Sequence, residues 1–288
     1  MYYHFSVFAA FSFAIGAIFG SFLNVCIWRI PRDESVVSPP SHCPRCNARI
    51  KWYQNIPVIS WCCLRGRCAS CHEPISVRYT IVELLGGVLF LMAYLQWGMP
   101  FFFGGDPAFG LMARRSLLTV PVCWLVFFGL MLGSFIDLEH FYLPDRVTIG
   151  GMILGVPASF LVPEMQGEAD GLHALYMSLS GMAGGFAVLW GVGWIFSKIL
   201  KKDALGFGDV KLMGAIGAFF GPWAVLFTIL VSSFAGSLVG IAMIARGKTK
   251  IGSFTAVPYG PFLAIGAVAW TFWGPTAMNW YLNLMNPQ

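Results

Sequence analysis

Long apolar runs, separated by short polar segments, recur along most of the chain. Residues 120–136 and 225–245 are continuously apolar over about 20 residues, the length of a membrane-spanning helix, and lack the alternation of a barrel strand. Because lipid admits only spans that satisfy their backbone hydrogen bonds internally, the pattern predicts transmembrane helices. Eight are expected, at residues 5–28, 81–97, 117–136, 147–162, 174–196, 210–220, 222–245 and 257–273.

These runs predict an all-α polytopic membrane protein in three parts. Residues 1–28 form a first transmembrane helix, residues 29–80 a polar loop domain, and residues 81–288 a membrane domain of seven helices. Composition agrees, since 57% of the 288 residues are hydrophobic and only 11% charged. Soluble domains carry about 25% charged residues, so a water-soluble enzyme is excluded.

The positions of the basic residues predict the orientation in the membrane. With the N-terminus outside, the inner segments 29–80, 137–146, 197–211 and 246–256 hold 8, 1, 4 and 3 Lys and Arg, or 16 of the 18. The positive-inside rule then places both termini outside and the polar loop in the cytoplasm. No Lys or Arg precedes the first apolar run, which is therefore expected to be an uncleaved helix. Orientation accounts for the net charge of +5 without a nucleic-acid partner.

Six of the eight cysteines fall in the loop 29–80, four of them in two C-x-x-C motifs. The motifs are Cys43-Pro44-Arg45-Cys46 and Cys68-Ala69-Ser70-Cys71, separated by 21 residues. Two such knuckles supply a tetrahedral set for a structural zinc ion. Two disulfides are the alternative, disfavoured in a reducing cytoplasm. We expect Cys62 and Cys63 to pack as small apolar residues, and His42 and His72 to take no part in the site.

Two acids stand at predicted helix ends on the cytoplasmic side. Asp137 ends the third predicted span, and Asp209 follows Gly206 and Gly208 at the start of the sixth. Paired carboxylates can activate water and carry a proton, and the glycines leave room for an extended substrate backbone. Alternatively, both are ordinary interfacial carboxylates, with Asp209 capping its helix. The sequence contains no H-E-x-x-H or G-x-S-x-G motif for another protease chemistry.

In order and position, these motifs resemble those of the bacterial type IV prepilin peptidases, a family of G-x-G-D intramembrane aspartic proteases. The matching segments are Phe19-Gly20-Ser21-Phe22-Leu23-Asn24-Val25, Cys43-Pro44-Arg45-Cys46, Val82-Glu83-Leu84-Leu85-Gly86, Leu143-Pro144-Asp145, Gly206-Phe207-Gly208-Asp209-Val210-Lys211 and Val257-Pro258-Tyr259-Gly260-Pro261-Phe262. The chain departs from the family pattern at Thr80, where an Arg-Tyr-Pro segment is usual.

The resemblance implies a fold, an activity and a location. Asp137 and Asp209 would be the catalytic dyad, Gly206 and Gly208 would line the substrate path, and the four Cys would hold zinc. The enzyme would sit in the bacterial inner membrane, remove a basic leader after a Gly from prepilins or pseudopilins, and then N-methylate the new N-terminus with S-adenosylmethionine.

Two other functions are compatible with the residues alone. One is a transporter or channel in which Asp137 and Asp209 relay protons or bind a cation. The other is a methyltransferase without proteolysis, in which Asp209 is structural. No glycine fingerprint of a Rossmann fold is present, so the methyl-donor site is not located by sequence. Asn24 and Glu83 are possible neighbours of that site, although Glu83 could instead pair with Arg78.

Overall fold

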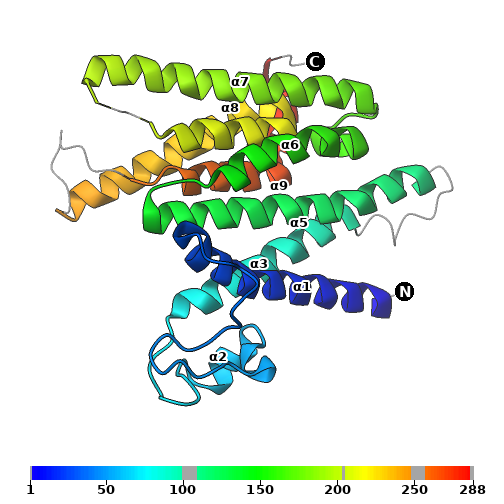
Figure 1. Ribbon diagram of the computed structural model, residues 1–288. Helices are drawn as coiled ribbons and strands as arrows, with labels where there is room; N and C mark the ends of the chain where they lie inside the picture. The colour runs from blue at the N-terminus through cyan, green and yellow to red at the C-terminus, as the bar shows by residue number, and fades with distance from the viewer. Residues whose placement is uncertain (1, 99–108, 203–204, 248–256, 286–288) are drawn as a thin grey trace. The chain divides into compact units, whose positions relative to one another are not determined.

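A computed structural model describes residues 2–98, 109–202, 205–247 and 257–285 of the protein (Figure 1). The chain divides into two compact units, Met1–Phe128 and Gly129–Gln288. The boundary falls within helix α5 (Phe109–His140), so the end of this helix, which carries Asp137, belongs to the second unit.

The first unit is built on two helices with their backbones in contact. Helix α1 (Tyr2–Arg29) packs on α3 (Val77–Ala93), which continues into a short π-helix, η3 (Tyr94–Gly98). A methyl group on Gly86 would lie 2.6 Å from the carbonyl oxygen of Gly16, and one on Gly20 would lie 2.7 Å from Cα of Glu83. Only glycine permits this separation, which lets the two helices associate without relying on large side chains.

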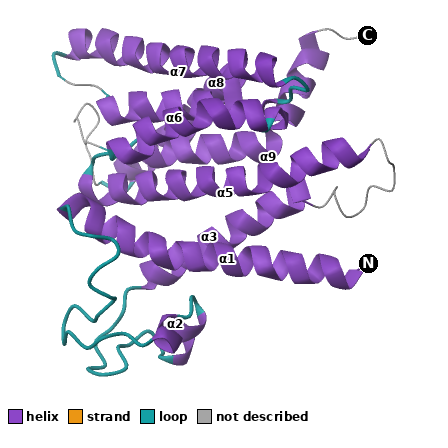
Figure 2. Cartoon of the chain, turned by 45° about the vertical axis from the view of Figure 1, so that its right-hand side comes forward, coloured by secondary structure: helices purple, strands orange, loops and turns teal. Residues whose placement is uncertain are grey.

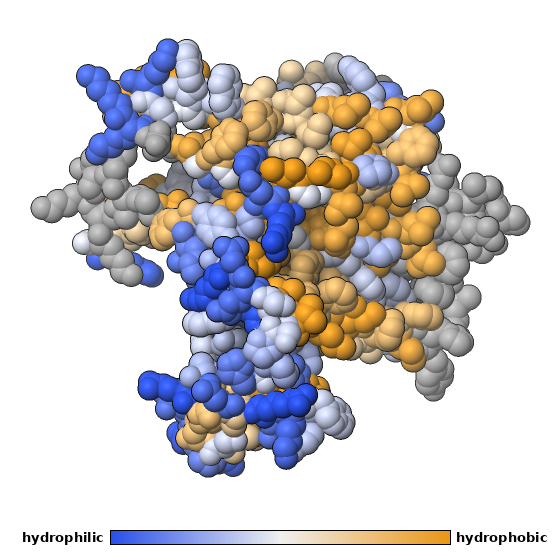
Figure 3. All heavy atoms as spheres, viewed as in Figure 1, coloured by the Kyte–Doolittle hydropathy of each residue, from blue (hydrophilic) through white to orange (hydrophobic). Residues whose placement is uncertain are grey.

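The segment between α1 and α3 is polar and mostly irregular. It contains η1 (Ile30–Arg32), η2 (Trp52–Asn55) and α2 (Ile59–Cys63), and otherwise consists of loops and turns (Figure 2). Its surface is largely hydrophilic, whereas the helices present mainly hydrophobic side chains (Figure 3). Helix α3 begins four residues before the predicted start at residue 81, because the Ser76 side chain accepts a hydrogen bond from the Arg78 N–H and caps the helix.

The second unit is an assembly of helices around α8. It contains the end of α5, then α6 (Asp145–Leu161), η4 (Pro163–Gln166), α7 (Gly171–Leu200), α8 (Phe207–Ala245) and α9 (Gly260–Met285). Helix α8 packs on α6, α7 and α9. Its first arm is almost entirely buried, in keeping with this central place.

Helix α8 folds back on itself at Gly221. This residue has φ of 79° and ψ of −178°, a backbone conformation that essentially only glycine adopts, and Pro222 follows it. A methyl group on Gly185 of α7 would lie 2.8 Å from the Met213 carbonyl oxygen and 3.1 Å from a Val225 methyl carbon. In a straight helix Met213 and Val225 would be about 18 Å apart and could not both contact Gly185. The chain therefore reverses, and the prediction of two separate helices at 210–220 and 222–245 is confirmed (Figure 1).

Helices occur at all eight predicted positions, and the all-helical prediction is confirmed for the described residues. Five segments are long and apolar enough to cross a membrane: Ser6–Arg32, Val77–Gly98, Leu117–His140, Gly171–Leu200 and Phe207–Ala245. The last of these contains both arms of α8. Helix α6, with 17 residues, and α9 are not among them. The count of eight spans therefore stays a prediction.

Candidate active site and metal centre

Asp137 lies near the end of α5 and is buried, with 6% of its surface exposed. Its Oδ2 accepts a hydrogen bond of 2.9 Å from the backbone N–H of Gly260, the first residue of α9. The carboxylate therefore faces the positive end of the α9 dipole. A buried anion is costly without such partners, and α9 provides one for Asp137.

Asp209 is the third residue of α8 and is 8% exposed. Its carboxylate interacts with the backbone of Gly206, the N-cap residue, and with the charge of Asp137. Among the residues that the structure describes, its Oδ1 has no hydrogen-bond partner. An acid at the third position of a helix can accept a hydrogen bond from the N-cap N–H, as in a capping box. This capping role explains the position of one oxygen of Asp209 but not of Oδ1.

Leu143, in the turn between α5 and α6, packs against the glycines at the starts of α8 and α9. A methyl group on Gly208 would lie 2.9 Å from Leu143 Cβ, and one on Gly260 would lie 3.4 Å from Leu143 Cδ2. The start of α8 and the start of α9 therefore pack against the same side chain. This packing brings Asp209 and Asp137 to one end of the unit, as the sequence predicts.

The resemblance predicts that Gly206 and Gly208 line the substrate path, and the structure gives each a second reason to be glycine. A methyl group on Gly206 would lie 3.0 Å from Asp209 Oδ2, and the space beside Gly208 is filled by Leu143. The two glycines thus make room for the protein's own groups. Their contact with substrate stays a prediction.

An ion pair that the sequence did not identify joins the first turns of α6 and α8. Lys211 Nζ lies 2.6 Å from Asp145 Oδ1. Lys211 is two residues beyond Asp209, and Asp145 is two beyond Leu143. The pair therefore holds the start of α8 beside the turn that carries Leu143. The sequence offers one hint of this pair: the motif Leu143-Pro144-Asp145 ends in an acid, and the motif from Gly206 to Lys211 ends in a base.

The four cysteines of the two C-x-x-C motifs converge on one point. The ligand atoms of Cys43, Cys46, Cys68 and Cys71 all lie within 4.8 Å of one another. The Cys43 and Cys71 sulfurs are 3.8 Å apart. Thiolates at about 2.3 Å from a tetrahedral zinc ion are separated by about 3.8 Å. The cluster could therefore hold a metal ion, and its spacing fits zinc.

The two halves of this cluster have the same local structure. In the first, Asn47 N–H donates to the Cys43 carbonyl and Cys43 N–H to the Ala48 carbonyl; in the second, His72 N–H donates to the Cys68 carbonyl and Cys68 N–H to that of Glu73. Asn47 and His72 both have positive φ, 54° and 57°. Each turn directs its two sulfurs inward without a hydrophobic core.

Thiolate character is also favoured by backbone donors. The N–H groups of Cys71 and Ser70 lower the pKa of the Cys68 thiol to about 6, whereas burial and the neighbouring sulfurs raise the pKa of the Cys71 thiol to about 12. A thiolate is the form that binds a metal ion.

The expectation that Cys62 and Cys63 pack as small apolar residues is wrong, since both are exposed. Helix α2, which carries them, has no buried residue against which they could pack.

Asn24 and Glu83 lie where α1, α3 and the polar loop meet. The Asn24 side-chain amide donates to the Tyr79 carbonyl at 3.1 Å, and Glu83 Oε2 accepts a 2.8 Å hydrogen bond from the Val58 N–H. Val58 has φ of 63°, which is strained for a β-branched residue. Glu83 therefore anchors a strained turn of the loop to the helix pair, an interaction with no signal in the sequence.

Two family models match the chain. The Bacterial Peptidase A24 N-terminal domain matches residues 14–97, and the Type IV leader peptidase family matches residues 124–241. The first match covers the second half of α1, the four cysteines and α3, and the second covers both Asp137 and Asp209. Each candidate site thus lies within a matched segment.

Curated relatives agree with these matches, whereas no solved structure matches the chain. A prepilin leader peptidase/N-methyltransferase of Myxococcus xanthus is 40% identical over 84% of this chain and 65% of its own length. One of the same name from Xanthomonas campestris is 33% identical, covering 93% and 92%. A type 4 prepilin-like proteins leader peptide-processing enzyme of Escherichia coli is 34% identical, covering 88% and 90%. The chain thus spans under two thirds of the first relative and about nine tenths of the others. It belongs to the type IV prepilin peptidase family.

Proposed function

We propose that this protein is an aspartic endopeptidase of the bacterial inner membrane. It removes the basic leader from type IV prepilins or type II secretion pseudopilins after a Gly, and then N-methylates the new N-terminal residue. The observation that carries the proposal is the meeting of two buried carboxylates at one end of the second unit, with Asp209 Oδ1 free of hydrogen bonds within the described residues. Family membership and the names of the relatives support both activities.

The dyad hydrolyses the peptide bond with one shared proton. Two neighbouring carboxylates resist ionising together, so one is a carboxylate and the other a carboxylic acid. The carboxylate takes a proton from water as the water oxygen bonds to the scissile carbonyl carbon. The acid then gives its proton to the amide nitrogen as the C–N bond breaks. The pair again holds one proton, with the roles exchanged.

The position of the dyad suits the proposed substrate. A prepilin has a polar leader followed by an apolar helix, so its scissile bond lies at a membrane boundary. Asp137 and Asp209 lie at helix ends, on the side where 16 of the 18 basic residues of the sequence are expected. This supports an active site and a polar loop that face the cytoplasm, with both termini outside.

The four cysteines are proposed to hold a structural zinc ion. Four thiolates complete a tetrahedral shell and leave no open position for catalysis. The polar segment between α1 and α3 lacks a core of its own, and zinc would contribute the missing folding energy. In this role zinc fixes the shape of the loop and takes no part in hydrolysis.

The dyad assignment is tested by replacing each acid with its amide. In a detergent assay on a prepilin, Asp137→Asn and Asp209→Asn should each lower the cleavage rate by more than about a thousandfold, because neither amide can exchange a proton. Asp170→Asn is the matched control. That residue caps α7 by accepting a hydrogen bond from the His173 N–H, far along the chain from both acids, and asparagine can do the same.

Mass spectrometry of a client's N-terminus reports leader removal and methylation together. Cleavage by both amide variants at the wild-type rate would show that the dyad is wrongly assigned. Methylation of a pre-cleaved pilin by a protein that cannot cut the precursor would support the methyltransferase alone.

A further inference from the structure

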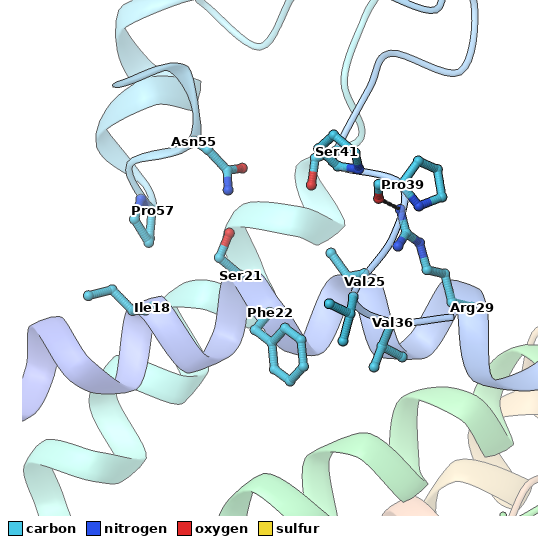
Figure 4. A pocket seen from close by; sticks show the side chains of 12 residues that line it. Ile18, Ser21, Phe22, Val25, Arg29, Val36, Pro39, Ser41, Asn55 and Pro57 are labelled. Atoms are coloured by element: carbon cyan, nitrogen blue, oxygen red, sulfur yellow. Dashed lines mark hydrogen bonds between the residues drawn. The ribbon is translucent and has the colours of Figure 1, made fainter. Parts of the chain in front are cut away.

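A groove in the Met1–Phe128 unit runs between the second half of α1 and the loop segment 36–57 (Figure 4). Its volume is about 270 Å³, close to the lower end of the roughly 300–1,000 Å³ of small-molecule sites. Its walls are apolar, with a few polar groups that converge on the space, as is usual for such sites. The lining includes Ile18, Ser21 and Val25 from α1 and Val36, Asn55 and Pro57 from the loop.

A buried cation lies at one end of the groove. Arg29 is 7% exposed, and its guanidinium donates to the carbonyls of Ser35 at 2.8 Å and Pro39 at 2.7 Å. Within the described residues no carboxylate pairs with it, and further N–H groups of its five remain for a ligand. A buried charge without an opposite partner is costly, so this end of the groove favours an anionic group.

A buried carboxyl group, that of Glu83 on α3, stands behind the other end. Ser21 of α1 lines the groove, and its side chain lies close enough to the Glu83 carboxyl group of α3 to interact with it. Glu83 is itself buried and is held by the Val58 N–H. Ser21 and Arg29 are eight residues apart on α1, or about 12 Å along the helix. The groove therefore has the Arg29 guanidinium at one end and the Glu83 carboxyl group behind the other.

We infer that this groove binds S-adenosylmethionine, with Arg29 facing the carboxylate of the methionine part and Glu83 favouring its cationic groups. The inference rests on the proposed methyl-transfer function. The donor is an elongated molecule with an anionic carboxylate at one end, a sulfonium cation nearby and a flat nucleoside beyond. A phospholipid headgroup would satisfy Arg29 but would gain nothing from Glu83.

Equilibrium binding of S-adenosylmethionine to the full chain in detergent tests the assignment. Val25→Trp fills the groove and should weaken binding at least tenfold, whereas Val7→Trp, at an exposed position of the same helix outside the groove, should leave binding unchanged. Arg29→Lys keeps the charge but loses the fork of donors, and should also weaken binding at least tenfold. Bound metal and leader cleavage, measured on each variant, report whether the loop and the dyad remain intact.

Comparing the binding of S-adenosylmethionine with that of S-adenosylhomocysteine tests the role of Glu83 separately from that of Arg29. S-adenosylhomocysteine lacks the sulfonium charge, so wild-type protein should prefer S-adenosylmethionine, and Glu83→Gln should reduce that preference at least fivefold. Wild-type affinity in both Val25→Trp and Arg29→Lys would overturn the location. A wild-type protein that cleaves prepilins but does not bind S-adenosylmethionine would overturn the location and the methyl-transfer function while leaving the peptidase in place.

Discussion

Gly260 shows how closely the backbone approaches the buried acid Asp137. Its N–H holds Asp137 at 2.9 Å, and a side chain at this position would begin 2.9 Å from the same oxygen. Any residue other than glycine must therefore displace the carboxylate or the start of α9. The geometry of Asp137 depends on the absence of one methyl group.

A Gly260→Ala substitution should lower prepilin cleavage by up to about a hundredfold, because a displacement near 1 Å in an active site costs that much. Gly150→Ala is the matched control, since nothing lies within 4 Å of the methyl group it would add on α6. Its cleavage rate should equal that of wild type. Equal rates for the two variants would mean that the Asp137 to Gly260 contact does not position the dyad.

The two acids could be predicted from sequence, but their partners could not. Asp137 and Asp209 stand out because acids are scarce in an apolar chain. Gly260 is 123 residues from Asp137, and only tertiary packing brings it there. Glycine spacing was equally uninformative: the sequence has seven pairs four apart, against roughly four expected by chance, yet Gly16 and Gly20 do contact α3.

At the scale of an element, the loop between α1 and α3 also combines features that the sequence predicts with features that it does not. The two cysteine knuckles are of the first kind. Each is a local turn whose hydrogen bonds stay within about six residues, so the motif predicts it well. Cys62 and Cys63 had no such local signal. Their exposure follows from the five-residue length of α2, which is too short to present a buried face.

Cys43→Ser and Cys68→Ser should each lower the zinc bound per chain, measured by elemental analysis, and make the loop 30–76 more sensitive to protease. Each removes one of four thiolates, and the remaining three do not close the tetrahedral shell. Cys62→Ser should retain zinc, since its exposed sulfur lies outside the cluster. One zinc per chain in all three variants would contradict the site.

Helix ends were the least predictable feature of the elements. Helix α7 extends from Gly171 to Leu200, beyond the apolar run at 174–196, and α9 begins at Gly260, three residues after the predicted start at residue 257. Hydropathy marks only the part of a helix that prefers lipid, and polar residues can extend it in either direction. The starts are better explained by caps such as Asp170, which accepts a hydrogen bond from the His173 N–H.

At the scale of the whole molecule, the distribution of charge predicts the orientation in the membrane, which helix packing does not. The 16 to 2 division of basic residues is a property of the entire chain, and it predicts which ends of the helices share a compartment. It could be read without a structure. Which helices pack together within a unit, such as α8 with α6, α7 and α9, could be learned only from the structure.

The exposed thiols allow the orientation to be measured. If the loop 29–80 faces the cytoplasm as proposed, a membrane-impermeant maleimide should label Cys62 and Cys63 in inverted vesicles and leave them unlabelled in intact spheroplasts. Cys26 and Cys123 are buried and should not contribute. A Glu168→Cys variant should show the opposite pattern. Labelling of Cys62 and Cys63 from outside would reverse the orientation.

The reversal at Gly221 also affects how the chain enters a membrane. Residues 212–245 contain no Asp, Glu, Lys, Arg or His, so the two arms of α8 form a hairpin whose tip is Gly221-Pro222. Proline has no N–H to leave unsatisfied there, and Gln166 donates to the Phe219 carbonyl. Moving one charge to the bilayer centre costs at least about 2.5 kcal/mol. This hairpin moves none, so it can insert as one unit while Asp209 and Arg246 stay on the side from which it enters.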